Sequence, residues 1–179
     1  LIVSYWGGLG AREMNKKIAQ FFACEQKDGL PFRHIHACGS FGWRWMPEYG
    51  KEQGVALAAH PRIDMREYIY DMPQMLAAAD LIICRAGAAT IAEVCAGGTP
   101  CIMVPSPNVT GNHQEKNARV LEDAGAAAVV READCDGRSL YETAKAILSD
   151  PERTGGMRTA ARGMAVVDAA ERIYQTAID

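Results

Sequence analysis

Short apolar runs recur along the chain, separated by longer segments in which apolar residues return at helical spacing. The runs predict strands at residues 1–5, 32–38, 55–59, within 63–69, and at 81–84, 101–104 and 127–131. Apolar runs without strict alternation are typical of parallel strands that are buried on both faces of a sheet. We therefore expect a sheet that is covered by helices on both sides.

The segments between these runs predict the helices. Within residues 12–26, for example, Met14 and Ile18 lie four residues apart on one helix face. Further helices are predicted at residues 43–53, 71–79, 90–97, 112–124, 139–149, 151–164 and 166–178. Strands that alternate with helices form right-handed βαβ units. The predicted fold class is therefore α/β, with a Rossmann-like parallel sheet and helices on both faces.

The size and composition suit one globular domain, which we predict to span residues 1–179. Apolar residues make up 49% of the chain and charged residues 23%, which is ordinary for a soluble protein with a sizeable core. A net charge of −3 without basic runs argues against a nucleic-acid partner. Six cysteines without a C-x-x-C pair are typical of a reduced, cytoplasmic protein.

The start of the chain suggests a longer protein. No apolar run is long enough to span a bilayer, and no signal-peptide pattern is present. The first residue, Leu1, already belongs to an apolar strand. We therefore expect this chain to be the later part of a protein whose preceding domain is absent.

A glycine-rich turn at residues 7–10 follows the first strand and opens the first helix, as a phosphate-binding loop does. The dinucleotide fingerprint G-x-G-x-x-G fails, because Glu13 occupies the position of the third glycine. The second strand also ends without the acidic residue that holds an adenosine ribose. We therefore predict no nicotinamide or flavin cofactor. A tight turn without a ligand is the alternative.

Residues 84–105 form a second candidate site, in which a small-residue turn links a strand to a helix. Ala86 and Gly87 allow a ligand to approach the backbone, and the free N–H groups of a helix start favour a phosphate. Glu93 has two interpretations. It either forms a capping box with Thr90, or its carboxylate accepts the two hydroxyls of a ribose.

Polar side chains at residues 112–117 open a helix after the loop that follows a predicted strand. The amides of Gln114 and Asn117 both donate and accept hydrogen bonds, which suits sugar hydroxyls. His113 is the one group of this set that suits proton transfer. A solvated first turn with ordinary capping is the alternative. Since no nucleophile motif accompanies these segments, they indicate a nucleotide-sugar site rather than a complete reaction centre.

His34 and His36 lie on the same face of a predicted strand. Two histidines in this arrangement suit a metal ion, but no third ligand is obvious nearby. We therefore predict no metal site, and expect one of the two to orient a loop or a ligand through a hydrogen bond.

Three motifs together resemble one enzyme family. They are the opening G-G-L-G-A-R-E-M-N from Gly7, C-R-A-G-A-A-T-I-A-E-V-C-A-G-G-T-P from Cys84, and V-P-S-P-N-V-T-G-N-H-Q-E-K-N-A-R from Val104. In their order and spacing they are similar to the MurG-type N-acetylglucosaminyltransferases. That family has two Rossmann-like domains in the GT-B arrangement, and this chain resembles its C-terminal, donor-binding half.

The resemblance implies roles for individual residues. Glu93 would hold the ribose hydroxyls, the backbone of Ile69 would meet the uracil, and Gln114 would contact the N-acetylglucosamine. Asn117 lies one helical turn beyond Gln114. The diphosphate would meet the backbone of Ala88, Ala89, Thr90, Ile91 and Ala92. The family turn reads G-G-S-x-G-A, and Gly8 replaces the serine that touches the donor phosphate, so only its amide remains for that contact.

By the same resemblance, the whole enzyme moves N-acetylglucosamine from UDP-N-acetylglucosamine to lipid I, which makes lipid II for peptidoglycan. The general base and the membrane-docking surface would belong to the N-terminal half. The implied location is cytoplasmic and peripheral, on the inner face of the bacterial cell membrane. Two alternatives remain: a UDP-N-acetylglucosamine 2-epimerase, and a non-catalytic nucleotide-binding α/β module.

Overall fold

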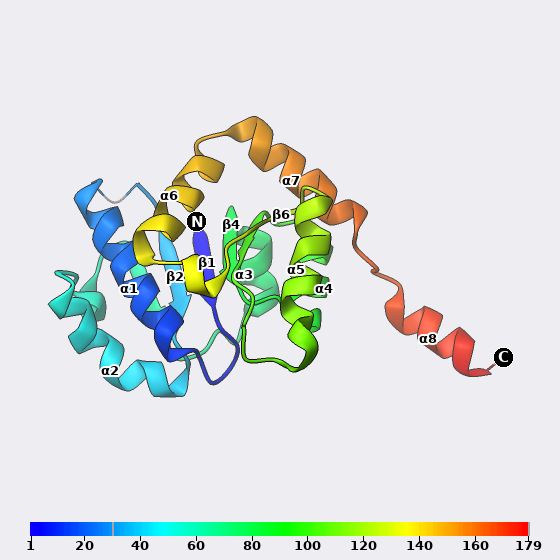
Figure 1. The fold of residues 1–179 in the computed structure, drawn as a ribbon, viewed down its shortest axis with the longest axis horizontal. Coiled ribbons are helices and arrows are strands. Elements are labelled where there is room, and N and C mark those ends of the chain that lie inside the picture. Colours follow the sequence, from blue (N-terminus) through cyan, green and yellow to red (C-terminus); the bar gives the residue numbers. More distant parts are fainter. Residues whose placement is uncertain (30, 179) are drawn as a thin grey trace.

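The computed structural model describes residues 1–29 and 31–178. Within them, six strands form one parallel sheet in the order β3-β2-β1-β4-β5-β6 (Figure 1). The strands are β1 (Ile2–Tyr5), β2 (His34–Ala37), β3 (Ile63–Arg66), β4 (Leu81–Cys84), β5 (Cys101–Met103) and β6 (Ala127–Val129). The predicted α/β fold with a parallel Rossmann-like sheet is confirmed. The predicted domain, residues 1–179, includes residues 30 and 179, which lie outside the described part of the chain.

Helices occupy most of the predicted positions. They are α1 (Arg12–Lys27), α2 (Gly39–Glu52), α3 (Met72–Ala78), α4 (Ala88–Gly97), α5 (His113–Asp123), α6 (Gly137–Leu148), α7 (Pro151–Gly163) and α8 (Ala169–Ile178). Helix α2 begins earlier than predicted, at Gly39 rather than at residue 43. Helix α8 has no buried residue and lies apart from the sheet (Figure 1). Over the described ranges, no helix has both the length and the apolar character to cross a membrane.

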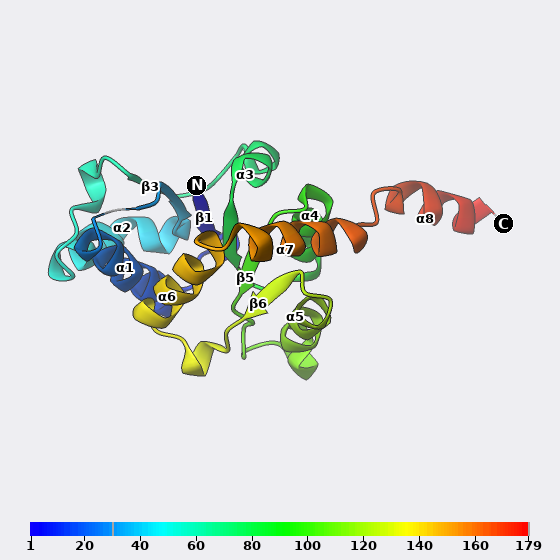
Figure 2. The ribbon, with the colours of Figure 1, turned by 90° about the horizontal axis from the view of Figure 1, so that it is seen from above.

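Alternate side chains of the central strands β1, β4 and β5 enter two separate cores. On β4, Leu81 and Ile83 pack with residues of α1, α2 and α6, whereas Ile82 packs with residues of α3, α4 and α5. Figure 2 shows α1 and α6 on one side of the sheet and α3 and α4 on the other. Helix α7 reaches both cores, through Met157 and Ala161. Full burial of one such aliphatic strand side chain contributes about 1.5–3 kcal/mol.

The predicted strand at residues 55–59 is wrong. The Val55 N–H donates to the Gly50 carbonyl at 2.8 Å at the end of α2, and a short 3-10 helix follows at Leu57–Ala59. Val55 and Leu57 are buried, and Leu57 packs against Gly50 of α2. Local hydrogen bonds satisfy this backbone, so the apolar residues are buried against a helix without pairing in the sheet.

The order of the strands changes direction between β1 and β4. After β1 the chain continues to β2 and β3 on one side, and after β4 it continues to β5 and β6 on the other. In this pairing Tyr5 lies beside Cys84 at the carboxyl ends of both strands, at the edge that faces downward in Figure 1. Segments that leave in opposite directions open a crevice, and open α/β sheets bind ligands there.

We expect Gly137→Ala to destabilise the fold, because Gly137 packs directly on α1. A Cβ at Gly137 would lie 2.3 Å from Gln20 Cβ and 2.6 Å from the Lys17 carbonyl oxygen. Overpacking of this kind costs about 1–3 kcal/mol of unfolding free energy, which urea titration measures. The matched control is Gly155→Ala in α7, where a Cβ would meet nothing within 4 Å. That control should be neutral or stabilise by up to about 1 kcal/mol, and equal unfolding free energies for the two variants would contradict the packing.

Candidate functional site

The glycine turn after β1 lies at the carboxyl edge, beside the segment that joins β3 to α3. Gly7 and Gly10 adopt φ angles of 80° and 77°, and the Gly10 N–H donates to the Gly7 carbonyl at 3.1 Å. Gly8 is exposed, and a Cβ on it would lie 3.6 Å from Cε2 of Tyr68. The turn and the Tyr68 ring therefore form one continuous surface.

Ile69 anchors the segment on the far side of this contact. Its side chain is 2% exposed, whereas the flanking Tyr68 and Tyr70 are 49% and 90% exposed, with ring centroids 4.9 Å apart. The two tyrosine rings therefore cover the surface beside the buried anchor. Our sequence analysis did not select Tyr68. The available signal was the Tyr-Ile-Tyr pattern, in which one apolar residue separates two aromatic ones.

The start of α4 is uncapped. Gly87 is the N-cap residue, and no side chain caps the first turn. The first intrahelical hydrogen bond runs from the Ile91 N–H to the Gly87 carbonyl at 3.0 Å. The N–H groups of the three preceding residues, Ala88, Ala89 and Thr90, therefore have no intrahelical acceptor and suit an anion.

The capping-box interpretation of Glu93 is wrong, because α4 begins at Ala88 rather than at residue 90. Thr90 therefore lies within the first turn and not at the N-cap. The side chain of Glu93 is exposed, as is Ala92 beside it, and Glu93 takes part in none of the side-chain hydrogen bonds or ion pairs among residues 1–29 and 31–178. Its carboxylate is free to accept hydrogen bonds from a ligand.

Tyr5 connects the end of β1 to α4. Its side chain is buried, and its hydroxyl has no hydrogen-bond partner within the described ranges. Burial raises the pKa of Tyr5, and the Cys84 thiol and the Glu93 carboxylate add to the increase. Tyr5 pairs with Cys84 at the end of β4, and α4 begins four residues later, so Glu93 belongs to the helix that starts beside the carboxyl end of β1. The sequence did not identify Tyr5 as a site residue, since a single tyrosine at the end of an apolar strand is not a recognisable motif.

The first turns of α5 present two oriented amides. The Ser106 N–H donates to Oε1 of Gln114 at 2.9 Å, which leaves the Gln114 Nε2 group to donate elsewhere. Asn117 donates from Nδ2 to the Ala86 carbonyl at 3.4 Å, which leaves its Oδ1 to accept. The second contact ties α5 to the turn before α4. His113 is exposed, and its Nδ1 lies 3.0 Å from a backbone carbonyl of the preceding turn.

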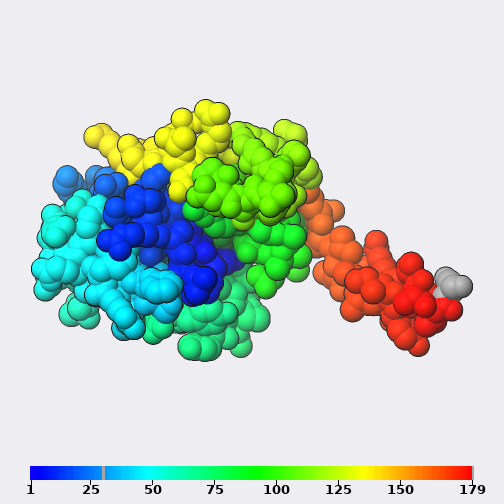
Figure 3. Space-filling model, turned by 60° about the horizontal axis from the view of Figure 1, so that its bottom comes forward, coloured from blue at the N-terminus to red at the C-terminus, as the bar shows by residue number. Residues whose placement is uncertain are grey.

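Four segments therefore come together at one edge: the glycine turn, the segment around Ile69, and the starts of α4 and α5. Figure 3 looks toward this edge, where the blue, green and yellow-green parts of the chain adjoin. The predicted residues form an open surface. A hollow of about 670 Å³ lies between α1 and the loop before α5, and none of the predicted residues lines it.

The two histidines of β2 point into the core rather than toward this surface. Both hydrogen-bond to the Ser4 hydroxyl, at 2.8 Å for His34 and 2.7 Å for His36. Burial, with a further contribution from His34, lowers the pKa of His36 to about 3. Over residues 1–29 and 31–178, no group of three or more His, Cys, Asp or Glu residues is placed to hold a metal ion.

A curated relative from Acetivibrio thermocellus is named UDP-N-acetylglucosamine--N-acetylmuramyl-(pentapeptide) pyrophosphoryl-undecaprenol N-acetylglucosamine transferase. It is 38% identical over 175 residues, which make up 98% of this chain and 46% of that protein. The chain thus spans about half the length of the curated relatives it matches.

Solved structures agree with this relation. The crystal structure of MurG from Acinetobacter baumannii has a TM-score of 0.83 and 27% identity, over 98% of this chain and 50% of that chain. A UDP-N-acetylglucosamine 2-epimerase has a TM-score of 0.66 and 15% identity, over 99% of this chain and 42% of that chain, and so shares the fold alone. The family described as glycosyltransferase family 28 C-terminal domain matches residues 2–173. Because that match covers nearly the whole chain, the chain belongs to the family of glycosyltransferase family 28 C-terminal domains.

Proposed function

We propose that residues 1–179 form one UDP-sugar-binding domain, the donor half of an inverting glycosyltransferase. The whole protein would move N-acetylglucosamine from UDP-N-acetylglucosamine to lipid I, which makes the lipid II of peptidoglycan. Family membership supports this proposal, as does the name of the Acetivibrio thermocellus relative, a pyrophosphoryl-undecaprenol N-acetylglucosamine transferase.

The observation that carries the proposal is the uncapped start of α4 at the switch point, with the free Glu93 carboxylate one turn further along. In the proposal, the backbone of residues 88–92 holds the donor diphosphate, through the free N–H groups of its first three residues, assisted by the Gly8 amide. Glu93 accepts the ribose hydroxyls, and the backbone of Ile69 meets the uracil. The oriented amides of Gln114 and Asn117 bind the sugar hydroxyls.

The departing UDP carries developing negative charge, and fixed amide dipoles at a helix start stabilise such charge without reorganisation. In the proposal, this half supplies that stabilisation, while the general base, the lipid I site and the membrane-docking surface lie in a further domain. The full protein is then cytoplasmic and peripheral on the inner membrane face. The present chain by itself should bind donor weakly and not turn over.

A 2-epimerase is the less supported alternative. Such an enzyme interconverts UDP-sugars without a lipid acceptor, and it needs several acids and histidines around the sugar. At the proposed sugar position the chain offers the amides of Gln114 and Asn117, and His113 precedes Gln114 in the chain.

We expect Glu93→Ala to weaken UDP binding strongly, because a carboxylate that accepts ribose hydroxyls makes charge-assisted hydrogen bonds. Loss of such contacts corresponds to about 1.5–3 kcal/mol, or a rise in the dissociation constant of roughly ten- to a hundredfold. Isothermal titration calorimetry with UDP, UDP-N-acetylglucosamine and UDP-glucose measures this change.

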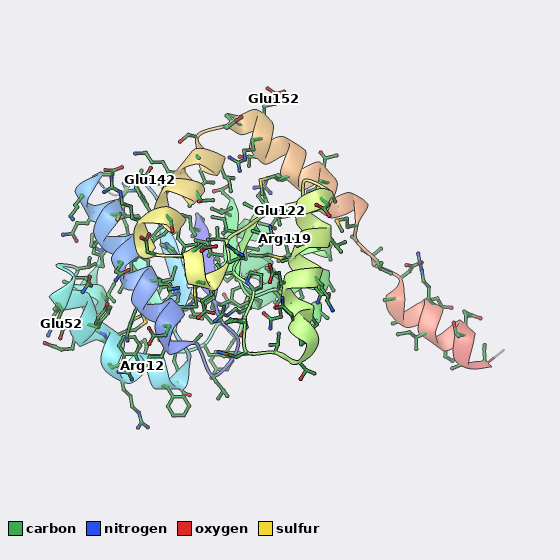
Figure 4. All side chains as sticks on the ribbon, viewed as in Figure 1. Arg12, Glu52, Arg119, Glu122, Glu142 and Glu152 are labelled. Atoms are coloured by element: carbon green, nitrogen blue, oxygen red, sulfur yellow. The ribbon has the colours of Figure 1, made fainter. Side chains whose placement is uncertain are left out.

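The matched control is Glu142→Ala on α6, since Glu142 is likewise an exposed helical carboxylate and lies far from the carboxyl edge (Figure 4). It should leave the affinity for UDP unchanged. An unchanged affinity of Glu93→Ala for UDP would contradict the proposed contact between Glu93 and the ribose.

We expect Gly8→Ser to tighten binding of UDP-N-acetylglucosamine by about three- to tenfold, since one added hydrogen bond contributes about 0.5–1.5 kcal/mol. The substitution should be tolerated, because Gly8 is not among the glycines with positive φ and a Cβ there meets Tyr68 only at 3.6 Å. Gly8→Ala is the control that adds the Cβ without the hydroxyl. Equal affinities for the two variants would argue against a phosphate at this turn.

A further inference from the structure

A continuous series of buried polar side chains runs between the sheet and α1. His34 Nε2 lies 2.8 Å from Ser4 Oγ, which lies 2.7 Å from His36 Nδ1. His36 Nε2 lies 3.2 Å from Asn15 Oδ1. At the other end, His34 Nδ1 faces Oε2 of Glu25 at 3.7 Å. All five residues are at most 1% exposed. We call these five residues the buried polar series.

The direction of every hydrogen bond in the series follows from its end at the Cys38 carbonyl, which can only accept. Asn15 donates from Nδ2 to the Cys38 carbonyl at 2.7 Å, so its Oδ1 must accept from His36 Nε2–H. A neutral His36 then accepts at Nδ1, and the Ser4 hydroxyl must donate to it. Since the Ser4 proton is used there, Ser4 Oγ accepts from His34 Nε2–H.

The far end of the series, between His34 and Glu25, is not closed by a hydrogen bond. With its proton on Nε2, a neutral His34 would direct the Nδ1 lone pair at Glu25, and both Glu25 oxygens lack a hydrogen-bond partner within the described ranges. At 3.7 Å the two atoms are too far apart for a hydrogen bond. The hydrogen bonds that run from His34 to the Cys38 carbonyl therefore have a single order, and an ordered set of this kind makes a core rigid.

The near end of the series lies against the glycine turn. The Cys38 carbonyl oxygen, which accepts from Asn15, would lie 2.2 Å from a Cβ on Gly10. A Cβ on Gly39 would lie 2.4 Å from the Leu9 carbonyl oxygen. The loop after β2 and the turn after β1 are therefore in direct backbone contact, and a shift of the Cys38 carbonyl must move the turn.

We propose that Asn15 and His36 are positioning residues of the donor site, which fix the glycine turn from beneath so that the Gly8 amide meets the donor diphosphate. This inference rests on the proposed function. Asn15 acts by holding the Cys38 carbonyl in place, and His36 acts by holding the carboxamide of Asn15 in the orientation that donates to that carbonyl. Glu25 and His34 complete the order at the end remote from the ligand.

The test compares Asn15→Leu with Glu25→Gln by calorimetric titration with UDP, alongside thermal melting. Leucine has the branched outline of asparagine, with more bulk, but cannot donate to Cys38, so the affinity for UDP should fall about tenfold. Glutamine supplies His34 with an N–H donor and keeps the order, so its affinity should stay within about twofold of wild type. If Asn15→Leu does not fold, Asn15→Asp replaces it, since aspartate keeps the shape and lacks the donor.

The outcomes distinguish the positioning role of Asn15 from the proposed function of the domain. Wild-type affinity in the Asn15 variant, or an equal loss in Glu25→Gln, would overturn the positioning role while leaving the proposed function intact. A wild-type chain that binds no UDP would overturn the proposed function and this inference with it. The ¹⁵N NMR signals of His36 should be those of a neutral Nε2–H tautomer. An Nδ1–H tautomer would overturn the donor order whatever the UDP titration gives.

Discussion

The pairing of β1 with β4 is the contact on which the site depends. After β1 the chain continues toward β2, and after β4 it continues toward β5, on the other side. The turns that follow the two strands therefore lie next to each other at the carboxyl edge of the sheet. Burial on both faces fixes the register, from Ile2 beside Leu81 to Tyr5 beside Cys84. A shift of β1 by one residue would move Ser4 from the histidines into the other, apolar core. The same register therefore builds both the site and the polar series beneath it.

The start of α4 lacks the side-chain cap that two other helices of the fold have. Helix α6 is capped by Asp136, whose carboxylate accepts from the Ser139 N–H at 2.7 Å, and α7 is capped in the same way by Asp150. At α4 the N-cap is Gly87, which provides no side-chain acceptor. Glycine in place of a capping side chain costs a few tenths of a kcal/mol. In the proposed function that cost is offset, because a capping side chain would occupy an amide that the diphosphate needs.

The sequence predicted secondary structure correctly where a local pattern of apolar or small residues determines it. The apolar run at residues 81–84 became a central strand, and the small residues after it became a strand-to-helix turn. The apolar run at residues 55–59 did not become a strand, since its apolar side chains are buried against α2 instead of in the sheet. Tyr5 and Tyr68 were missed, because their significance comes from residues that only folding brings beside them, Cys84 for Tyr5 and Gly8 for Tyr68. We expected His34 or His36 to orient a loop or a ligand through a hydrogen bond, whereas both bond to the hydroxyl of Ser4 on the neighbouring strand β1.

The buried polar series lies against the glycine turn and restricts its movement. Glycine loses more backbone freedom on folding than any other residue, so a turn that contains three glycines is intrinsically loose. A loose turn binds weakly, since each ligand must order it first. Side chains such as Glu25 and His34 are costly to bury, and apolar residues would fill the same space more cheaply. Their retention is understandable if the series supplies what an apolar core does not. An ordered set of hydrogen bonds fixes the direction of one carbonyl, that of Cys38, against which the turn rests.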